Sequence, residues 1–143
     1  MKISDCMTRD VKLVSPDQPI REAARFMLSA DAGSIPVGDG DRLVGMITDR
    51  DIAVRAVAEG LGPDTPVREV MSGELLYVFE DQSIEEVAEN MSDSQVRRFP
   101  VVNREKKLVG IVSLGDISQG AHHEAAHRAL DGVTDPGGAH SQT

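Results

Sequence analysis

Residues 123–127 read His-Glu-Ala-Ala-His, which is the spacing of a zinc metalloprotease site. In such enzymes the two histidines lie one helical turn apart on the metal, and the glutamate is the general base. The third ligand is missing here: a common form of the motif needs a glycine and a further ligand where Leu130 and Val133 stand, and no glutamate follows His127. We therefore expect no catalytic residue, no required cofactor and no dedicated metal site. Metal binding stays open as an alternative for the histidines of the chain, which are His122, His123, His127 and His140.

A second pattern, Ser or Thr followed three residues later by Asp, occurs at Thr48–Asp51 and again at Ser113–Asp116. Each follows a short apolar run, where a helix is expected to begin. A carboxylate in a first helical turn can accept two hydrogen bonds from a ribose diol, and the hydroxyl and backbone N–H groups there can bind a phosphate. The alternative is structural: Asp51 and Asp116 could be helix N-caps, with Thr48 and Ser113 supporting the turn.

The two patterns belong to an internal repeat. Residues 3–27 align with residues 67–91 at an offset of 64, so that Met7 falls on Met71 and Met27 on Met91. "GSIPV" then falls on "RRFPV" at the same offset, and "RLVGMITDRDI" falls on "KLVGIVSLGDI" at an offset of 65. Two copies of this length indicate a pseudo-symmetric pair rather than a solenoid array.

Each copy predicts strand, helix, strand, strand, helix. The first strands are expected at Val11–Val14 and Leu75–Val78, and the first helices begin after Pro19 and Ser83. Their apolar residues have helical spacing; these are Ile20, Ala23, Ala24 and Met27 in the first copy and Ile84, Val87, Ala88 and Met91 in the second. The turns "DGDR" and "NREK" join the two later strands, and Gly60 is expected to end the last helix of the first copy.

The repeat also gives a domain plan. We predict one motif over residues 1–62 and a second over residues 63–121. At the offset of 65, Glu124 falls on Glu59, so the His-Glu-Ala-Ala-His string is predicted to extend the last helix over residues 122–132, where Gly132 ends it. Residues 133–143 are predicted to be a flexible tail.

Composition excludes several classes of protein. A net charge of −9 and an aromatic content of 3% argue against a nucleic-acid binder, which needs a basic face and stacking platforms. The sequence has no apolar run long enough to span a membrane and no apolar stretch near its N-terminus typical of a secretory signal. A single cysteine, Cys6, cannot form an intramolecular disulfide, and we expect a cytoplasmic protein.

The motifs "SIPVGDGDRLVGMITDRDI" and "RRFPVVNREKKLVGIVSLGDI" resemble those of tandem CBS (cystathionine β-synthase) domains, a pair known as a Bateman module. The resemblance covers residues 3 to about 120 and extends to small stand-alone bacterial CBS-pair proteins. It implies an α/β (α+β) fold of two βαββα motifs packed through their sheets. It also implies a regulatory role, with AMP, ADP, ATP or S-adenosylmethionine bound in two clefts between the motifs, and a homodimer.

In the family each cleft draws on both motifs. Carried over by position, the first cleft would consist of Thr48, Arg50, Asp51, Leu76, Val96, Arg97, Arg98, Phe99 and Pro100. The second cleft would consist of Lys12, Val14, Gly33, Ser34, Ile35, Pro36, Ser113 and Asp116.

The two clefts differ in charge. The first collects three guanidinium groups, which suit phosphate oxygens. The second has Gly115 at the position of Arg50, Gly33 and Ser34 at those of Arg97 and Arg98, and only Lys12 as a cation. A charged nucleotide is therefore expected in the first cleft, and an uncharged nucleoside or nothing in the second. The alternative for Arg97 and Arg98 is that they pair with surface carboxylates.

Three functions follow as hypotheses. The first is a non-catalytic sensor that binds an adenosine-type ligand and signals to a partner protein. The second is a stress-associated CBS-pair protein that binds no ligand and acts through protein contacts alone. The third, more remote, is a zinc-binding protein that uses the histidine-containing segment.

Overall fold

The computed structural model describes residues 1–73, 76–119 and 130–134. The chain divides into two compact units. The first-repeat unit consists of Lys12–Leu75 and Lys106–Leu108, and the second-repeat unit consists of Met1–Val11, Leu76–Glu105 and Val109–Thr143. The fold is α+β, as expected, but the compact units do not follow the order of the repeats along the chain.

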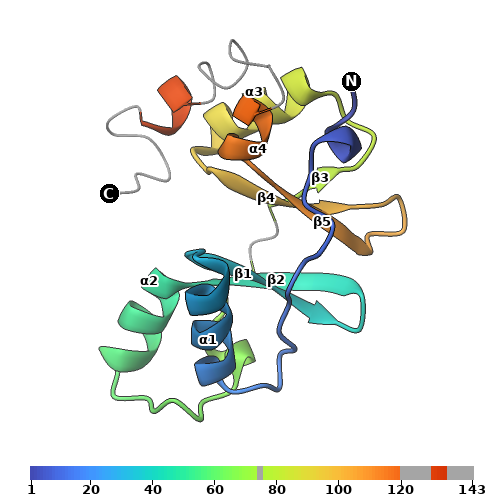
Figure 1. The fold of residues 1–143 in the computed structure, drawn as a ribbon. Coiled ribbons are helices and arrows are strands. Elements are labelled where there is room, and N and C mark those ends of the chain that lie inside the picture. Colours follow the sequence, from blue (N-terminus) through green and yellow to red (C-terminus); the bar gives the residue numbers. More distant parts are fainter. Residues whose placement is uncertain (74–75, 120–129, 135–143) are drawn as a thin grey trace. The chain divides into compact units, whose positions relative to one another are not determined.

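The first-repeat unit is a β-hairpin covered by helices. Strands β1 and β2 are antiparallel, and helices α1 and α2 lie on the same side of them (Figure 1). The helix after β2 begins as α2 and continues as a wider π-helical turn, η2, which ends before Gly60 at φ 79°. The bounds are α1 Ile20–Ala30, β1 Ser34–Asp39, β2 Arg42–Thr48, α2 Asp49–Asp51, η2 Ile52–Val57 and the 3-10 turn η3 Val67–Glu69.

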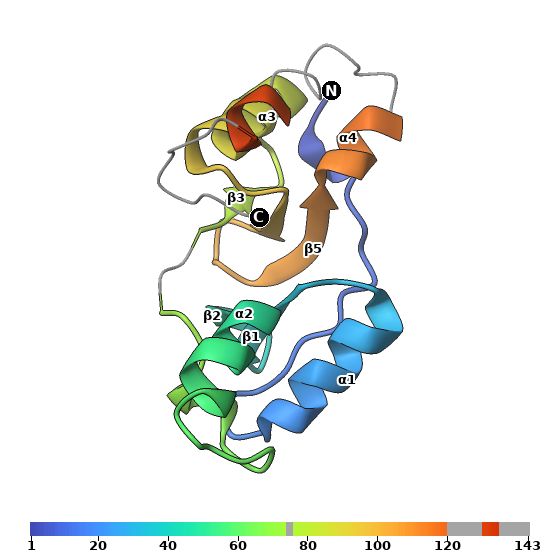
Figure 2. The same ribbon diagram turned by 90° about the vertical axis from the view of Figure 1, so that its left-hand side faces the viewer.

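The second-repeat unit has three strands in the order β3-β4-β5, with β3 parallel to β4. Helices α3 and α4 lie on one side of this sheet (Figure 2). The bounds are the 3-10 turn η1 Ile3–Asp5, β3 Val78–Phe79, α3 Ile84–Ser94, β4 Arg98–Val102, β5 Leu108–Ser113 and α4 Leu114–Gln119.

The predicted helices α1 and α3 form at the expected places. Pro19 precedes α1, and at the start of α3 the Ser83 Oγ accepts a hydrogen bond from the Glu86 N–H at 3.1 Å. Both helices end in a left-handed residue, Asp31 and Gln95. The predicted apolar positions are buried in both, with one exception: Ala24 is exposed, whereas its counterpart Ala88 is buried.

The segment before β1 differs from the prediction. Instead of a strand at Val11–Val14, only Val14 pairs with a strand, through a single parallel bridge to Val37. The Val14 N–H donates to Pro36 O at 3.1 Å, and Val14 O accepts from the Gly38 N–H at 2.9 Å. This one residue is enough to anchor the segment in the core, because its side chain is fully buried.

The residues that lead into each repeat complete the sheet of the other repeat. Thr8 and Ile111 exchange two backbone hydrogen bonds of 2.8 Å, so the start of the first repeat pairs with β5. Ser72 and Met46 exchange bonds of 2.9 and 3.2 Å, so the start of the second repeat pairs with β2. This exchange explains why residues 1–11 belong to the second-repeat unit and residues 67–73 to the first-repeat unit.

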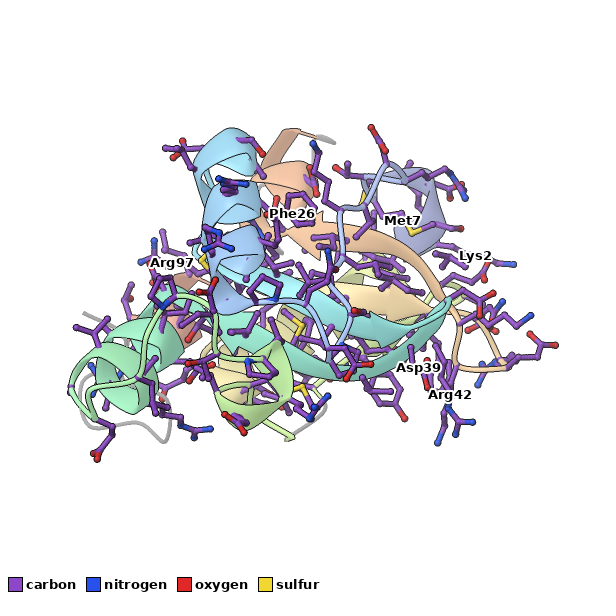
Figure 3. All side chains as sticks on the ribbon, turned by 90° about the horizontal axis from the view of Figure 1, so that it is seen from below. Lys2, Met7, Phe26, Asp39, Arg42 and Arg97 are labelled. Carbon is purple, nitrogen blue, oxygen red and sulfur yellow. The ribbon has the colours of Figure 1, made fainter. Side chains whose placement is uncertain are left out.

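A glycine in each last strand permits this close pairing. A Cβ on Gly45 would lie 2.8 Å from Ser72 O and 3.1 Å from the sulfur of Met71. A Cβ on Gly110 would lie 2.8 Å from Thr8 O and 2.7 Å from the sulfur of Met7, whose side chain lies against this part of β5 (Figure 3). The "Leu-Val-Gly" of both repeats is therefore a packing requirement, since real Cβ atoms do not approach other atoms so closely.

Gly132 does not end the helix that was predicted to stop there. The Thr134 N–H donates to Leu130 O at 3.0 Å across it, and Val133 is buried at 4% exposure. The Gly132 backbone instead lies directly against Ser92 of α3, and Gln95 Nε2 donates to Gly132 O at 3.0 Å. The described helical turn ends at Val133, one residue from the predicted boundary at residue 132, and the predicted helix over residues 122–129 lies outside the described residues.

We predict that Gly45→Ala lowers the free energy of unfolding by about 1–3 kcal/mol, the usual cost of overpacking. The added methyl group would collide with the backbone of Ser72. Replacing glycine by alanine also stabilises the protein by roughly 0.4–1 kcal/mol, because it lowers the conformational entropy of the unfolded chain, and the cost of the collision should exceed this gain. Urea unfolding followed by circular dichroism measures the change.

The matched control for this experiment is Gly62→Ala. A Cβ on Gly62 would meet nothing within 4 Å, so this variant should be as stable as the natural chain or slightly more stable. Equal stability of the Gly45→Ala and Gly62→Ala variants would contradict the close contact between β2 and residues 71–72.

Candidate functional site

The Thr48–Asp51 pattern forms the first turn of α2. The Thr48 N–H donates to Asp51 Oδ2 at 3.0 Å, and the Asp51 N–H donates to Thr48 Oγ1 at 3.0 Å. This reciprocal pair is a capping box, which satisfies two backbone donors that a helix start leaves unpaired. These residues therefore do cap the helix, but with exchanged roles: Thr48 is the N-cap, and Asp51, which was expected to be the cap, stands three residues into the helix.

The Ser113–Asp116 pattern forms the same turn at the start of α4. The Ser113 N–H donates to Asp116 Oδ2 at 2.9 Å, and the Asp116 N–H donates to Ser113 Oγ at 3.1 Å. The two sequence repeats thus form the same reciprocal pair of capping hydrogen bonds.

Capping leaves the second carboxylate oxygen of Asp51 for other contacts. Its capping bond uses Oδ2, whereas Oδ1 lies 4.0 Å from the Nε of Arg55, too far for a hydrogen bond. The side chain is 16% exposed, so it is partly desolvated but still reachable. A carboxylate can accept up to about four hydrogen bonds, and capping therefore does not exclude a ribose hydroxyl.

In each unit, the residue three positions before the proline of "Pro-Val" lies beside the capped turn of the same repeat. The Asp49 N–H donates to Gly33 O at 2.9 Å, and the Leu114 N–H donates to Arg97 O at 2.8 Å. Ser34 is also the register partner of Thr48 across the β1–β2 hairpin. The structure thus brings together predicted residues of the same unit. The pairing of residues from different units in one cleft stays a prediction.

The three arginines of the first predicted cleft lie on or near the surface. Arg50 and Arg97 are exposed and Arg98, the first residue of β4, is half-buried; Figure 3 labels Arg97. Within the described part of the chain, neither Arg97 nor Arg98 lies within ion-pair distance of a carboxylate. This weakens the alternative in which both only pair with surface acids.

Several predicted contact residues have side chains in the cores instead. Val14 and Ile35 belong to the core of the first-repeat unit, and Phe99 belongs to that of the second. Leu76 and Val96 pack against the core of the second-repeat unit and are half-buried, whereas Pro36 and Pro100 are buried. Core packing therefore explains why apolar side chains stand at these positions, and a ligand is not needed to explain them.

Lys12, the only cation of the second predicted cleft, has its ammonium group 5.6 Å from the centre of the Phe26 ring. Phe26 projects from α1, whereas Asp39 and Arg42 lie at the tip of the β1–β2 hairpin (Figure 3). A cation over an aromatic ring gains about 0.5–1 kcal/mol at an exposed site. This contact gives Lys12 a structural role that its sequence position did not predict.

Two residues beside the capped turns were not expected from the sequence. Arg55 approaches Asp51 and also donates from Nη1 to Met71 O at 3.3 Å, and its spacing of four residues from Asp51 could have indicated it. Asp49 lies against Gly33, since a Cβ there would be 3.1 Å from Asp49 Oδ2. Nothing in the sequence alone relates Asp49 to Gly33, because only the hairpin brings them together.

Cys6 lies close to the capped turn of the second-repeat unit. Its half-burial raises the pKa of the thiol above the ordinary value, and the carboxylates of Asp116 and Asp5 raise it further. The thiol is therefore protonated at neutral pH, which makes it a weak nucleophile.

We predict that Asp116→Asn lowers the pKa of Cys6, because it removes a negative charge that opposes the thiolate. Asparagine keeps an acceptor oxygen for the Ser113 N–H, so the turn should persist. The rate of alkylation by iodoacetamide between pH 7 and 10.5 measures the pKa. Asp93→Asn, an exposed change on α3, is the control and should leave the profile unchanged. An identical profile for Asp116→Asn would show that the two groups do not interact.

The histidine-containing string at residues 122–127 lies outside the described residues. Within the described ranges, no three His, Cys, Asp or Glu side chains are grouped as a metal would require. No helix in that part of the chain is long and apolar enough to cross a membrane.

Comparison with known proteins gives matches over almost the whole chain. The CBS domain family matches twice, at residues 3–57 and 67–122. The CBS domain-containing protein YhcV of Bacillus subtilis is 44% identical over 133 residues, which cover 92% of this chain and 94% of YhcV. Hypoxic response protein 1 of Mycobacterium tuberculosis is 37% identical over 134 residues, 92% of this chain and 93% of the relative.

Solved structures are also similar. The crystal structure of Hypoxic Response Protein I with two coordinated zinc ions matches with a TM-score of 0.75 at 39% identity, covering 83% of this chain and 98% of that one. The CBS domain pair of protein MJ0100, in complex with 5′-methylthioadenosine and S-adenosyl-L-methionine, matches with a TM-score of 0.73 at 28% identity. That match covers 87% of this chain and 98% of the MJ0100 pair.

Proposed function

The chain belongs to the CBS-domain family, as its repeated motifs predicted, and on that premise we propose that it is a regulatory module that binds an adenosine-containing ligand and signals to a partner protein. The observation that carries the proposal is the capped turn at Thr48–Asp51 and Ser113–Asp116, built twice with the same hydrogen bonds. Protein MJ0100, whose CBS pair was crystallised with two adenosine compounds, supports the class of ligand.

The proposal treats the module as non-catalytic, cytoplasmic and homodimeric. A ligand that binds between the motifs shifts the equilibrium between their arrangements if it binds one arrangement more tightly than the other. A partner protein whose affinity differs between the arrangements then responds to the ligand. The partner is another protein or a second copy of the chain.

Charge favours a phosphorylated ligand at the turn that contains Asp51. The proposed binding residues there include Arg50, Arg97 and Arg98, in a protein whose net charge is −9. At the other proposed site, Gly33 lies against the carboxylate of Asp49, which would repel a phosphate. An uncharged nucleoside part therefore suits the second site better than a nucleotide does.

We predict that AMP, ATP or S-adenosylmethionine binds with measurable heat, and that Arg98→Ala weakens AMP by roughly tenfold or more while adenosine is little affected. A hydrogen bond to a charged group contributes about 1.5–3 kcal/mol, and the variant would lose such a bond to the phosphate of AMP. Adenosine has no phosphate, so its affinity should not depend on this bond. Isothermal titration gives both affinities, and Arg42→Ala at the hairpin tip is the matched control.

Two outcomes would contradict this proposal. If none of the three ligands binds at millimolar concentration and none raises the thermal unfolding midpoint, the ligand-free alternative gains, because a ligand of the native state must raise that midpoint. An equal loss of AMP and adenosine affinity in Arg98→Ala would show that Arg98 does not contact the phosphate.

Zinc binding is a second candidate function, independent of the first. It is favoured by the two coordinated zinc ions in the crystal structure of Hypoxic Response Protein I and by the histidines at positions 122, 123, 127 and 140 of this chain. Imidazole is a common zinc ligand, and two histidines four residues apart can share a metal if they lie on a helix.

We predict that the purified protein retains zinc in a fixed ratio after exhaustive dialysis, and that the double variant His123→Ala/His127→Ala loses it. Elemental analysis of dialysed protein measures the ratio. His140→Ala, which leaves the paired histidines in place, is the comparison variant. Zinc that dialyses away from the natural chain would rule out a specific site.

A further inference from the structure

The C-terminal turn, residues 130–134, docks on the end of α3 and is drawn in red beside that helix in Figure 2. Gln95 Nε2 donates to Gly132 O at 3.0 Å, and the Gly132 backbone lies directly against Ser92. Val133 of the same turn is buried at 4% exposure. A hydrogen bond, a close backbone contact and a buried apolar side chain therefore hold the turn in place.

Gln95 is unusual in both its burial and its backbone. It is the one buried residue with a polar or charged side chain in the described part of the chain, at 5% exposure. Its φ of 54° is left-handed, a conformation that glycine, asparagine and aspartate adopt more readily than glutamine does. Burial of an amide is also costly unless the amide is hydrogen-bonded. The contact that its side chain makes therefore explains a glutamine here better than local backbone preference does.

The equivalent helix end in the first repeat has no such contact. Asp31 ends α1 with a similar φ of 51°, but its side chain is exposed. Leu28, which falls on Ser92 at the offset of 64, is 84% exposed. At this point of the repeat, the described structure thus has a docked turn on α3 and an exposed leucine on α1.

Gln95 leads directly into residues that are proposed to bind a phosphate. Arg97 and Arg98 follow it, and all of these residues belong to the second-repeat unit. The chain is fixed again where the Leu114 N–H donates to Arg97 O at 2.8 Å and where Arg98 begins β4. A change in the backbone at Gln95 would therefore move the start of a short segment and the guanidinium groups that it carries.

We propose that the C-terminal turn is a brace that places Arg97 and Arg98 for a ligand phosphate, with Gln95 as the positioning residue through which it acts. This inference rests on the adenosine-type ligand proposed above and adds a determinant of its phosphate affinity. The brace occurs in the repeat that has the arginines. The first repeat has Gly33 and Ser34 at their positions and therefore no cation to place.

Capping of α3 does not need the glutamine side chain. The Gln95 N–H and the Val96 N–H both donate to Met91 O, and these are backbone bonds. Glycine would make the same bonds and would adopt the left-handed conformation without steric cost. The variant Gln95→Gly therefore keeps the helix end and removes the bond to Gly132.

The test is isothermal titration of the full-chain Gln95→Gly variant with AMP and with adenosine. We expect AMP to bind roughly two- to tenfold more weakly, because the guanidinium groups must then be ordered on binding instead of beforehand. Adenosine has no phosphate and should keep its affinity. Retained adenosine affinity and an unchanged circular dichroism spectrum show that the variant is folded.

Gly132→Ala breaks the same contact from the other side, because its methyl group would lie against Ser92. It should weaken AMP by a similar factor. The double variant Gln95→Gly/Gly132→Ala should bind AMP no more weakly than either single variant, since both changes remove one contact. Losses that multiply in the double variant would overturn the brace.

The matched control is Asp31→Gly, which makes the change to glycine at the same position of the first repeat. It should leave the AMP affinity unchanged or raise it slightly, because it removes one negative charge. A loss of AMP affinity in Asp31→Gly as large as that in Gln95→Gly would overturn the inference, because Asp31 has no docked turn to release.

Amide hydrogen exchange tests the same contact in the ligand-free chain. The Thr134 N–H donates to Leu130 O within the turn, and the Leu114 N–H donates to Arg97 O. Both amides should exchange faster in Gln95→Gly than in the natural chain. Faster exchange at Thr134 alone would show that the turn docks without positioning Arg97, and it would overturn the inference.

The failures can be told apart. A natural chain that binds neither AMP nor adenosine would overturn the proposed ligand and with it the role of Gln95 in phosphate binding. A natural chain that binds AMP, together with a Gln95→Gly variant that binds it equally well, would keep the ligand and overturn the brace. A Gln95→Gly variant that loses AMP and adenosine affinity by the same factor would also overturn the brace.

Discussion

The rest of the structure depends on one constraint, the close backbone contact between each lead-in segment and the last strand of a sheet. The lead-in segments are residues 1–11, at the start of the first repeat, and residues 67–73, at the start of the second. Glycine at positions 45 and 110 lets the chain near Ser72 and Thr8 approach within hydrogen-bonding distance of β2 and β5. The fixed end of each strand then leads directly into a capped turn. If the strand end could shift, neither Asp51 nor Asp116 would have a defined position.

The same contact ties the two repeats together in the chain. The lead-in of the first repeat completes the sheet of the second, and the lead-in of the second completes that of the first. A single repeat cut from the chain would therefore keep its own lead-in segment, which packs in the other unit. It would lack the lead-in segment of the other repeat, which completes its sheet. Neither compact unit can therefore be completed without residues from the other repeat.

The sequence predicted the features that depend on local spacing. The buried stripes of α1 and α3, the hairpin turns and the two capped turns all follow from residue types a few positions apart. It did not predict which unit each lead-in segment joins, because that depends on contacts between residues far apart in the chain. Gly45 and Ser72 are more than 25 residues apart, and Thr8 and Gly110 are about 100 residues apart. The single bridge at Val14 was predicted as a strand for a related reason: apolar residues show burial, but they do not show how many hydrogen bonds the backbone makes.

The sequence predicted which residues lie near the capped turns better than it predicted what their side chains do. Periodicity could not show that Val14, Ile35 and Phe99 pack in the cores, because an apolar residue beside a cleft and one in a core have the same composition and spacing. Arg97 and Arg98 were expected from charge, and the structure adds that no described carboxylate pairs with them.

The double use of Asp51 connects the turn to the rest of its unit. One carboxylate oxygen holds the start of the helix, and the other lies near Arg55, which also donates to the carbonyl of Met71 in the lead-in of the second repeat. A hydroxyl of the proposed ligand, if bound at that oxygen, would lie near Arg55, whose guanidinium contacts the segment that pairs with β2. The position equivalent to Arg55 in the second repeat is Gly120, which has no side chain to make such a contact. The two turns share their capping bonds, therefore, but an arginine four residues after the aspartate occurs at the first turn and not at the second.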